Sequence, residues 1–280
     1  MLGPRDILRE IHRDDEAFRL FCSIAAKGES QGGWENGRIA ALARDPELAP
    51  KIARHGADED KHGRIFNAML HRRGLDPVDV PPETDYCMLL ERRGLGLAHD
   101  RLRRDEPLTE DDIVEYLVHS RVTEQRAAED MRMLRRYLGD DPDIGRGIRM
   151  ICEDEENHLA YCHEELLRLS ARDGRTHIGR ALRRTARAEI EVNRDVSLAV
   201  MDRMGRLLGW SRARRLALRV GIRVTYAYDR VWGTRRMVRL RPPTRADAMG
   251  PRGTDGATAG PPPEQGRTSR PGGGPGDRAG

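Results

Sequence analysis

The sequence predicts an all-α protein: a bundle of four long helices, then two further helices and a disordered tail. Apolar residues recur with spacings of three and four along most of the chain, whereas few segments alternate with the period of two that marks a strand. The four long helical segments form two pairs with short loops, and one long connection joins the pairs. This plan is typical of a four-helix bundle with one crossover.

The first pair of helices is predicted at 15–44 and 47–72, because Asp45-Pro46 interrupts the helical pattern between them. A long connection follows over 73–108. It contains three prolines and a short helix predicted near 85–103. The first pair should therefore form an antiparallel hairpin that is separated from the rest by this crossover.

The second pair is predicted at 109–138 and 143–171. Thr109 precedes three acidic residues, which is typical of a helix N-cap with a favourable charge in the first turn. Gly139 to Pro142 separates the two helices. Residues 1–171 are therefore predicted to form the bundle domain.

The segment 172–241 is predicted to form a helical extension, with helices near 176–208 and 211–235. Its candidate core positions are Ile178, Leu182, Ile190, Leu198, Met201, Leu207, Leu216, Val220 and Val224. The remaining segment, 242–280, contains 8 Pro and 10 Gly. Such a composition cannot bury enough apolar surface to offset the entropy of ordering, so this tail is predicted to be disordered.

Charge divides the chain along the same boundaries. The net charge of +4 is the result of −10 over residues 1–171, +13 over 172–241 and +1 over the tail. The basic extension could dock along the acidic bundle, or bind an anionic partner such as an electron-donor protein, an acyl carrier protein, a membrane surface or RNA. No nucleic-acid-binding motif is visible, so a nucleic-acid partner is disfavoured.

Several classes of protein are disfavoured by what the sequence lacks. No apolar run approaches the ~20 residues of a membrane-spanning helix, and the first residues contain no apolar core of signal-peptide length. We therefore expect a cytoplasmic protein without a membrane span. The four cysteines include no CxxC pair, which disfavours zinc ribbons, rubredoxin-type iron sites and disulfide scaffolds.

The clearest chemical signal is a repeated DExxH motif. Asp58-Glu59-Asp60-Lys61-His62 lies in the second predicted helix, and Asp154-Glu155-Glu156-Asn157-His158 lies in the fourth. Two copies would arise by chance in such a chain roughly 0.002 times. Glu and His three residues apart share a helical face, so one metal ion can bind both side chains.

Both motifs lie on the apolar stripe of their helix, where an unpaired carboxylate is costly. The first and third helices each carry one acid on their predicted stripes, namely Glu35 and Glu124. Glu35 precedes the Asp45-Pro46 turn by about as many residues as Glu59 follows it. Glu29 lies six residues from Glu35, so it is predicted to face away from the site.

On these residues the chain resembles the ferritin-like di-iron carboxylate proteins, which use one Glu from each of two helices and an ExxH from each of the other two. The resemblance covers residues 15–171. It implies that two iron ions, or one manganese and one iron, are bound by Glu35, Glu59, His62, Glu124, Glu155 and His158. It also implies that Asp58 and Asp154 orient the histidine ligands from facing helices.

His55 lies one turn before Glu59 on the same stripe. It could be a seventh metal ligand, but we expect it to be a hydrogen-bonded core residue or to contact the ligands without binding metal. Tyr161, one turn after His158, could be redox-active, although a packed tyrosine with a bonded hydroxyl is the preferred interpretation.

The resemblance implies activation of dioxygen, and favours the oxygenase and oxidase branch of the superfamily over ferritins and rubrerythrins. The expected activity is hydroxylation, N-oxygenation or desaturation of a small or carrier-tethered organic substrate, with electrons from a separate ferredoxin or reductase. A ferroxidase or peroxide scavenger, and a metal-free helical binding module, remain alternatives. A homodimer also remains open.

Overall fold

The computed structural model describes residues 3–173 and 175–240. Every helix or strand assigned in these ranges is a helix, so the predicted all-α class is confirmed for the described residues. The predicted tail at 242–280 lies outside them. The described residues of the bundle and its extension belong to one compact unit.

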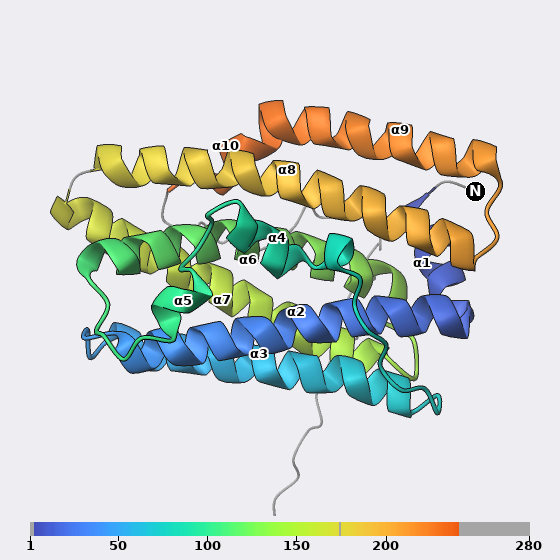
Figure 1. Cartoon of the computed structure of the whole chain (residues 1–280), viewed down its shortest axis with the longest axis horizontal. Helices are drawn as coiled ribbons and strands as arrows, with labels where there is room; N and C mark the ends of the chain where they lie inside the picture. Colours follow the sequence, from blue (N-terminus) through green and yellow to red (C-terminus); the bar gives the residue numbers. More distant parts are fainter. Residues whose placement is uncertain (1–2, 174, 241–280) are drawn as a thin grey trace, which may run out of the picture. The chain divides into compact units, whose positions relative to one another are not determined.

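Four long helices form the bundle (Figure 1). They are α2 (Asp15–Leu42), α3 (Leu48–His71), α6 (Glu110–Leu138) and α7 (Gly145–Asp173). The pairs α2–α3 and α6–α7 make the most extensive contacts in the chain, as expected for two hairpins. Thr109 forms a complete capping box with Asp112 at the start of α6, so the predicted N-cap is also observed.

The sequence analysis missed the helix α1 (Pro4–Arg13), which packs against α2. The crossover also differs from the prediction. It forms a 3-10 turn, η1 (Pro82–Thr84), and two short helices, α4 (Tyr86–Arg92) and α5 (His99–Leu102), instead of one helix near 85–103. Gly94 and Gly96 separate α4 from α5 because both adopt left-handed backbone angles, with φ of 68° and 76°.

Small residues allow α2 and α3 to approach closely. A Cβ atom added to Gly56 would lie 3.0 Å from the backbone oxygen of Gly33 and 3.0 Å from the backbone nitrogen of Gly37. A Cβ atom added to Gly63 would lie 2.6 Å from Oγ of Ser30. This close packing fixes which face of α2 meets α3.

Two apolar clusters fill the bundle at different heights. One contains Ile39, Ile52, Leu117 and Leu166, and the other contains Phe18, Phe66, Leu134 and Ile151. On α3, α6 and α7, the histidines and glutamates of the two motifs and Glu124 lie between residues of these two clusters. The core is therefore apolar at both ends and polar in the middle.

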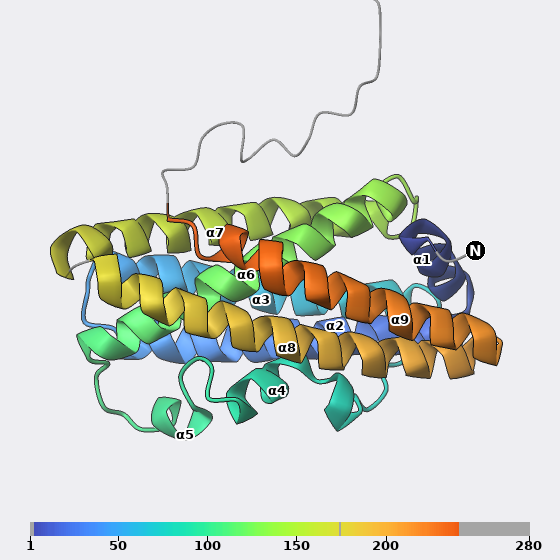
Figure 2. The same cartoon turned by 90° about the horizontal axis from the view of Figure 1, so that it is seen from above.

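The extension begins with α8 (Arg175–Leu207), which packs on α6 and α7 and lies beside the crossover helix α4 (Figure 2). It docks through the buried residues Ile178, Leu182 and Ile190, which were predicted to be core. It also docks through a buried ion pair of 3.0 Å between Arg126 on α6 and Glu189 on α8.

The chain then forms α9 (Arg212–Tyr228), the π-helical turn η2 (Asp229–Gly233) and α10 (Thr234–Met237). The core prediction is wrong for Leu207, Leu216, Val220 and Val224, which are between 45% and 64% exposed. These apolar residues do share one face of α9, but α9 contacts the rest of the protein with its opposite face. Among the described residues, no helix is long and apolar enough to cross a membrane.

Candidate metal centre

Two groups of side chains in the polar middle of the bundle have the composition of metal sites. The His62 group consists of Glu29, Glu59, His62 and Glu155, and the His158 group consists of His55, Glu59, Glu124 and His158. Within each group the potential ligand atoms all lie within 4.8 Å of one another. Glu59 belongs to both groups, so two ions bound here would share a carboxylate.

The His62 group combines α2, α3 and α7. Nδ1 of His62 lies 3.2 Å from Oε2 of Glu29 and 3.4 Å from Oε1 of Glu155. His62 is completely buried and Glu155 is 1% exposed. Three carboxylates and one imidazole from three helices therefore converge on one small volume.

The His158 group combines α3, α6 and α7. Nδ1 of His158 lies 3.4 Å from Oε1 of Glu59 and 3.7 Å from Oε2 of Glu124. Nε2 of His55 lies 3.0 Å from Oε1 of Glu59 and 3.4 Å from Oε1 of Glu124. The second oxygen of Glu155 lies 3.8 Å from Nδ1 of His158, so Glu155 also extends from one group toward the other.

Opposite charges stabilise each other in this buried layer. Burial opposes the charged form of His62, but Glu155 and Glu29 outweigh it and raise the histidine pKa to about 10. In the same way Glu124 and Glu59 raise the pKa of His55 to about 9 despite its burial. Burial tends to raise the pKa of Glu124, but His55 and His158 lower it to about 2. A bound cation would supply the same positive charge to these carboxylates.

Several buried atoms in the two groups have no hydrogen-bond partner. They are Oε2 of Glu124, Oε2 of Glu155, and both ring nitrogens of His158. Buried polar atoms are nearly always hydrogen-bonded, so four such atoms in one layer call for an explanation. Metal coordination explains the two carboxylate oxygens and Nδ1 of His158, because carboxylate and imidazole lone pairs are the donors that iron and manganese bind. Nε2 of His158 instead faces Asp58. Each group could therefore hold a metal ion.

Acidic residues lie behind both motif histidines. Oδ2 of Asp154 lies 3.1 Å from Nε2 of His62, and Oδ2 of Asp58 lies 3.7 Å from Nε2 of His158. Lys61 joins the two acids, with Nζ 2.7 Å from an oxygen of each. Each aspartate thus sits behind the histidine of the other motif, which is the crossed arrangement that the resemblance implies.

His55 differs from its expected supporting place, because its Nε2 is part of the His158 group. Its Nδ1 is 2.7 Å from the hydroxyl of Tyr161, which is 2.6 Å from the hydroxyl of Tyr116. Tyr116 donates to Asn36 over 2.8 Å. This buried chain fixes the orientation of the His55 ring and uses the Tyr161 hydroxyl as a bonded group.

The structure does not bring Glu35 into either group. Its Oε1 instead accepts hydrogen bonds from His99 at 2.8 Å and from Gln31 at 2.9 Å. The α2 carboxylate in the layer is Glu29, and the expectation that Glu29 faces away from the site is wrong. The packed stripe of α2 runs through Cys22, Ala26, Glu29, Gly33 and Asn36, one residue out of phase with the predicted stripe. Its small residues, facing Gly56 and Gly63, were the signal for this face.

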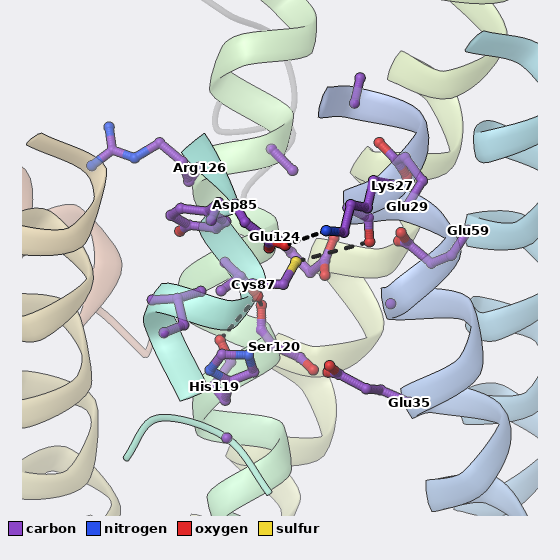
Figure 3. Close-up of a pocket in the computed structure, with 18 of the residues that line it drawn as sticks. Lys27, Glu29, Glu35, Glu59, Asp85, Cys87, His119, Ser120, Glu124 and Arg126 are labelled. Atoms are coloured by element: carbon purple, nitrogen blue, oxygen red, sulfur yellow. Dashed lines mark hydrogen bonds and ion pairs between the residues drawn. The ribbon is translucent and has the colours of Figure 1, made fainter. Parts of the chain in front are cut away.

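A cavity of about 370 Å³ lies beside the two groups. Figure 3 shows the carboxylates of Glu29, Glu35, Glu59 and Glu124 along one side of it. The rest of its wall includes many apolar side chains from α2, α3, α6, α8 and the crossover, which are Phe21, Ile24, Ile39, Phe66, Leu90, Leu95, Leu97, Met131, Leu134 and Val196. An organic molecule in this cavity would lie against the candidate metal ligands.

No protein-family model matches the sequence, and a search of curated proteins finds no match. Fold and site geometry are therefore the basis for assigning a function.

Proposed function

We propose that the protein is a di-iron enzyme that uses dioxygen to oxidise a small organic molecule, as an oxygenase or an oxidase. The observation that carries this proposal is the pair of overlapping ligand groups, joined through Glu59 and open to a cavity with a largely apolar wall. A purely structural metal site would need neither a shared carboxylate nor space for a substrate.

The ligands in this proposal are Glu29, Glu59 and His62 with Glu155 for one ion, and His55, Glu124 and His158 with Glu59 for the other. Two iron ions, when bound, would supply the redox chemistry that activates dioxygen. One manganese and one iron remain an alternative, because the same donors suit both metals. Asp154 lies within hydrogen-bonding distance of the His62 imidazole, and Asp58 lies behind the His158 imidazole, where each would orient a ligand.

The cavity favours a mostly apolar substrate without a net charge. Away from the candidate ligands, several charged lining groups already have partners, such as Lys27 with Asp85 at 2.8 Å and Glu35 with His99. A neutral molecule would leave these pairs intact while its apolar surface leaves water. We assign the electrons that an oxygenase consumes to a separate donor protein.

The test is metal content followed by oxygen uptake. Purified protein loaded with Fe(II) without oxygen should retain close to two irons per chain and consume dioxygen when it is admitted. Glu59→Gln should reduce binding of both ions, because Glu59 belongs to both groups, whereas Glu35→Gln on α2 should leave the metal content unchanged. Full iron loading in Glu59→Gln would overturn the proposal.

The same protein separates the alternatives. A ferroxidase would oxidise many Fe(II) equivalents per chain, and a peroxide scavenger would turn over hydrogen peroxide faster than dioxygen. A metal-free binding module would show the same melting temperature with and without chelator.

A further inference from the structure

Helix α9 presents an unpartnered apolar face. Leu216, Val220, Val224, Tyr228 and Val231 follow one another at spacings of three or four residues, so they share one side of the helix and the turn after it. Each is between 52% and 64% exposed. We name these five residues the α9 stripe. Its length is about 22 Å at the rise of a helix.

The stripe lies on the outside of the molecule. Figures 1 and 2 show α9 running along α8 on the side away from α2 and α3. The inner side of α9 makes its contacts through half-buried residues such as Leu218, and none of its residues is fully buried. Burial against α8 therefore does not explain why the outer side is apolar.

Four arginines border the stripe along one flank. Arg212, Arg219, Arg223 and Arg230 are spaced by seven, four and seven residues, so they form one row, and all four are exposed. Arg219 pairs with Asp202 at 2.8 Å and Arg230 donates to the Tyr226 hydroxyl at 3.1 Å. Arg212 and Arg223 have no ion pair with any described residue. α9 contains no acidic residue, and Asp202 on α8 offsets the charge of Arg219 alone, so this flank is positive on balance.

A second copy of the chain is a poor occupant for this surface. Two α9 helices packed antiparallel by a two-fold axis would bring the two arginine rows together, with no acid on either helix to offset the repulsion. Leu207 and Trp232 are also exposed and lie near the stripe. Elsewhere among the described residues, the exposed large apolar side chains are Trp34 and Met133, whose exposed fractions are 38% and 36%. They are too few to form a complementary patch for a different packing of copies.

We propose that the α9 stripe and its arginine row dock on an anionic lipid surface, with the helix lying in the plane of the headgroups. An amphipathic helix with arginines beside an apolar face is suited to this position. Trp232, 51% exposed, lies next to the end of the stripe that contains Tyr228, and tryptophan and tyrosine side chains favour the boundary between lipid and water. An acidic protein partner would need a preformed groove to accept this convex helix. A fluid lipid surface needs no such groove.

The test is sedimentation of the full-length protein with vesicles. Vesicles of equal parts phosphatidylglycerol and phosphatidylcholine should bind the protein, and pure phosphatidylcholine vesicles should bind much less. Removing each arginine charge should weaken binding roughly fivefold. The variant with Arg212, Arg219, Arg223 and Arg230 all changed to Gln should therefore bind several hundred-fold more weakly.

Matched controls are available on α1 and on the bundle helices. Arg5, Arg9, Arg13 and Arg64 are exposed, so changing these four to Gln removes the same charge elsewhere and should leave most binding intact. Leu216→Gln should reduce binding, whereas Met133→Gln should not. On binding, the tryptophan emission should shift to the blue, and Trp232→Phe, unlike Trp34→Phe, should abolish the shift.

Three results would overturn the proposal. They are the absence of binding to the anionic vesicles, equal loss of binding in the two sets of arginine variants, and a dimer in solution that Leu216→Gln dissociates. The last result would identify a second copy as the occupant. None of these readouts involves the metal centre, so this proposal and the proposed function can fail separately.

Discussion

Glu29 and Glu35 on α2 offer the sharpest test of the candidate metal centre. Glu29→Gln preserves the shape of the side chain while removing one of the three carboxylates of the His62 group. Glu35→Gln makes the same chemical change six residues further along the same helix, where the side chain binds His99 instead. Only the first change should weaken metal binding.

The expected size of the effect follows from the number of ligands. A four-ligand metal site in a protein contributes an apparent binding free energy of about 10–16 kcal/mol, so one of four donors is worth roughly 3 kcal/mol, or about 150-fold in affinity. At a metal concentration near 100 times the dissociation constant, an ion stabilises the fold by about 2.7 kcal/mol. After a 150-fold loss of affinity only about 0.3 kcal/mol remains at the same concentration.

The assay is thermal unfolding without oxygen, with and without Fe(II), together with metal analysis. For a chain of this size, 1 kcal/mol corresponds to a change in melting temperature of about 2–4 °C. Glu29→Gln should therefore lose about 5–10 °C of the metal-induced rise in melting temperature. Glu35→Gln should retain that rise. If Glu29→Gln keeps the full rise, or if Glu35→Gln loses as much, the assignment of Glu29 as the α2 ligand is refuted.

Three further predictions concern packing, pH dependence and the residues behind the ligands. Gly56→Ala should destabilise the protein by roughly 1–3 kcal/mol in urea unfolding, because the added Cβ would meet the α2 backbone. Gly37→Ala has open space around it and should stabilise the protein by roughly 0.5–1 kcal/mol. Equal effects of the two substitutions would contradict the close approach of α2 and α3. Burial tends to raise the pKa of Glu165, but Lys51 and Arg168 outweigh burial and lower that pKa. The wild type should therefore be more stable than Glu165→Gln at pH values above the pKa of glutamate in the unfolded chain, which is about 4.3. This advantage should vanish as the pH falls through the lower folded value, and a difference in unfolding free energy that stays constant with pH would exclude the ion pairs as its source. Asp154→Asn should weaken metal binding roughly 10–100-fold in equilibrium dialysis, while Glu153→Gln, an exposed neighbour, should leave it unchanged.

Much of the fold could be predicted because the information is local. The period of apolar residues, the Asp45-Pro46 break and the Thr109 cap act within a few residues of the chain, so all four bundle helices were predicted close to their observed bounds. The crossover was harder, because it divides where Gly94 and Gly96 adopt left-handed backbone angles. The helix α1 lies before the first predicted helix and was missed.

Part of the candidate site could be predicted, because the spacing within each motif fixes the relative positions of its Glu and His. Glu59 with His62, and Glu155 with His158, share a face of one helix whatever surrounds them. Glu29 could not be chosen over Glu35 in this way, because that choice depends on how α2 is rotated against α3. The rotation is set by backbone contacts at Gly33 and Gly56 between residues distant in sequence.

Local patterns in the sequence were enough to predict the four bundle helices, to find the two DExxH motifs and to separate an acidic body from a basic extension. Tertiary packing was needed to show which α2 carboxylate joins the motifs, that His55 reaches the His158 group, and that the outer face of α9 stays exposed. These three outcomes have one cause. Periodicity states that a helix has an apolar or polar face, but packing against distant residues decides where that face points.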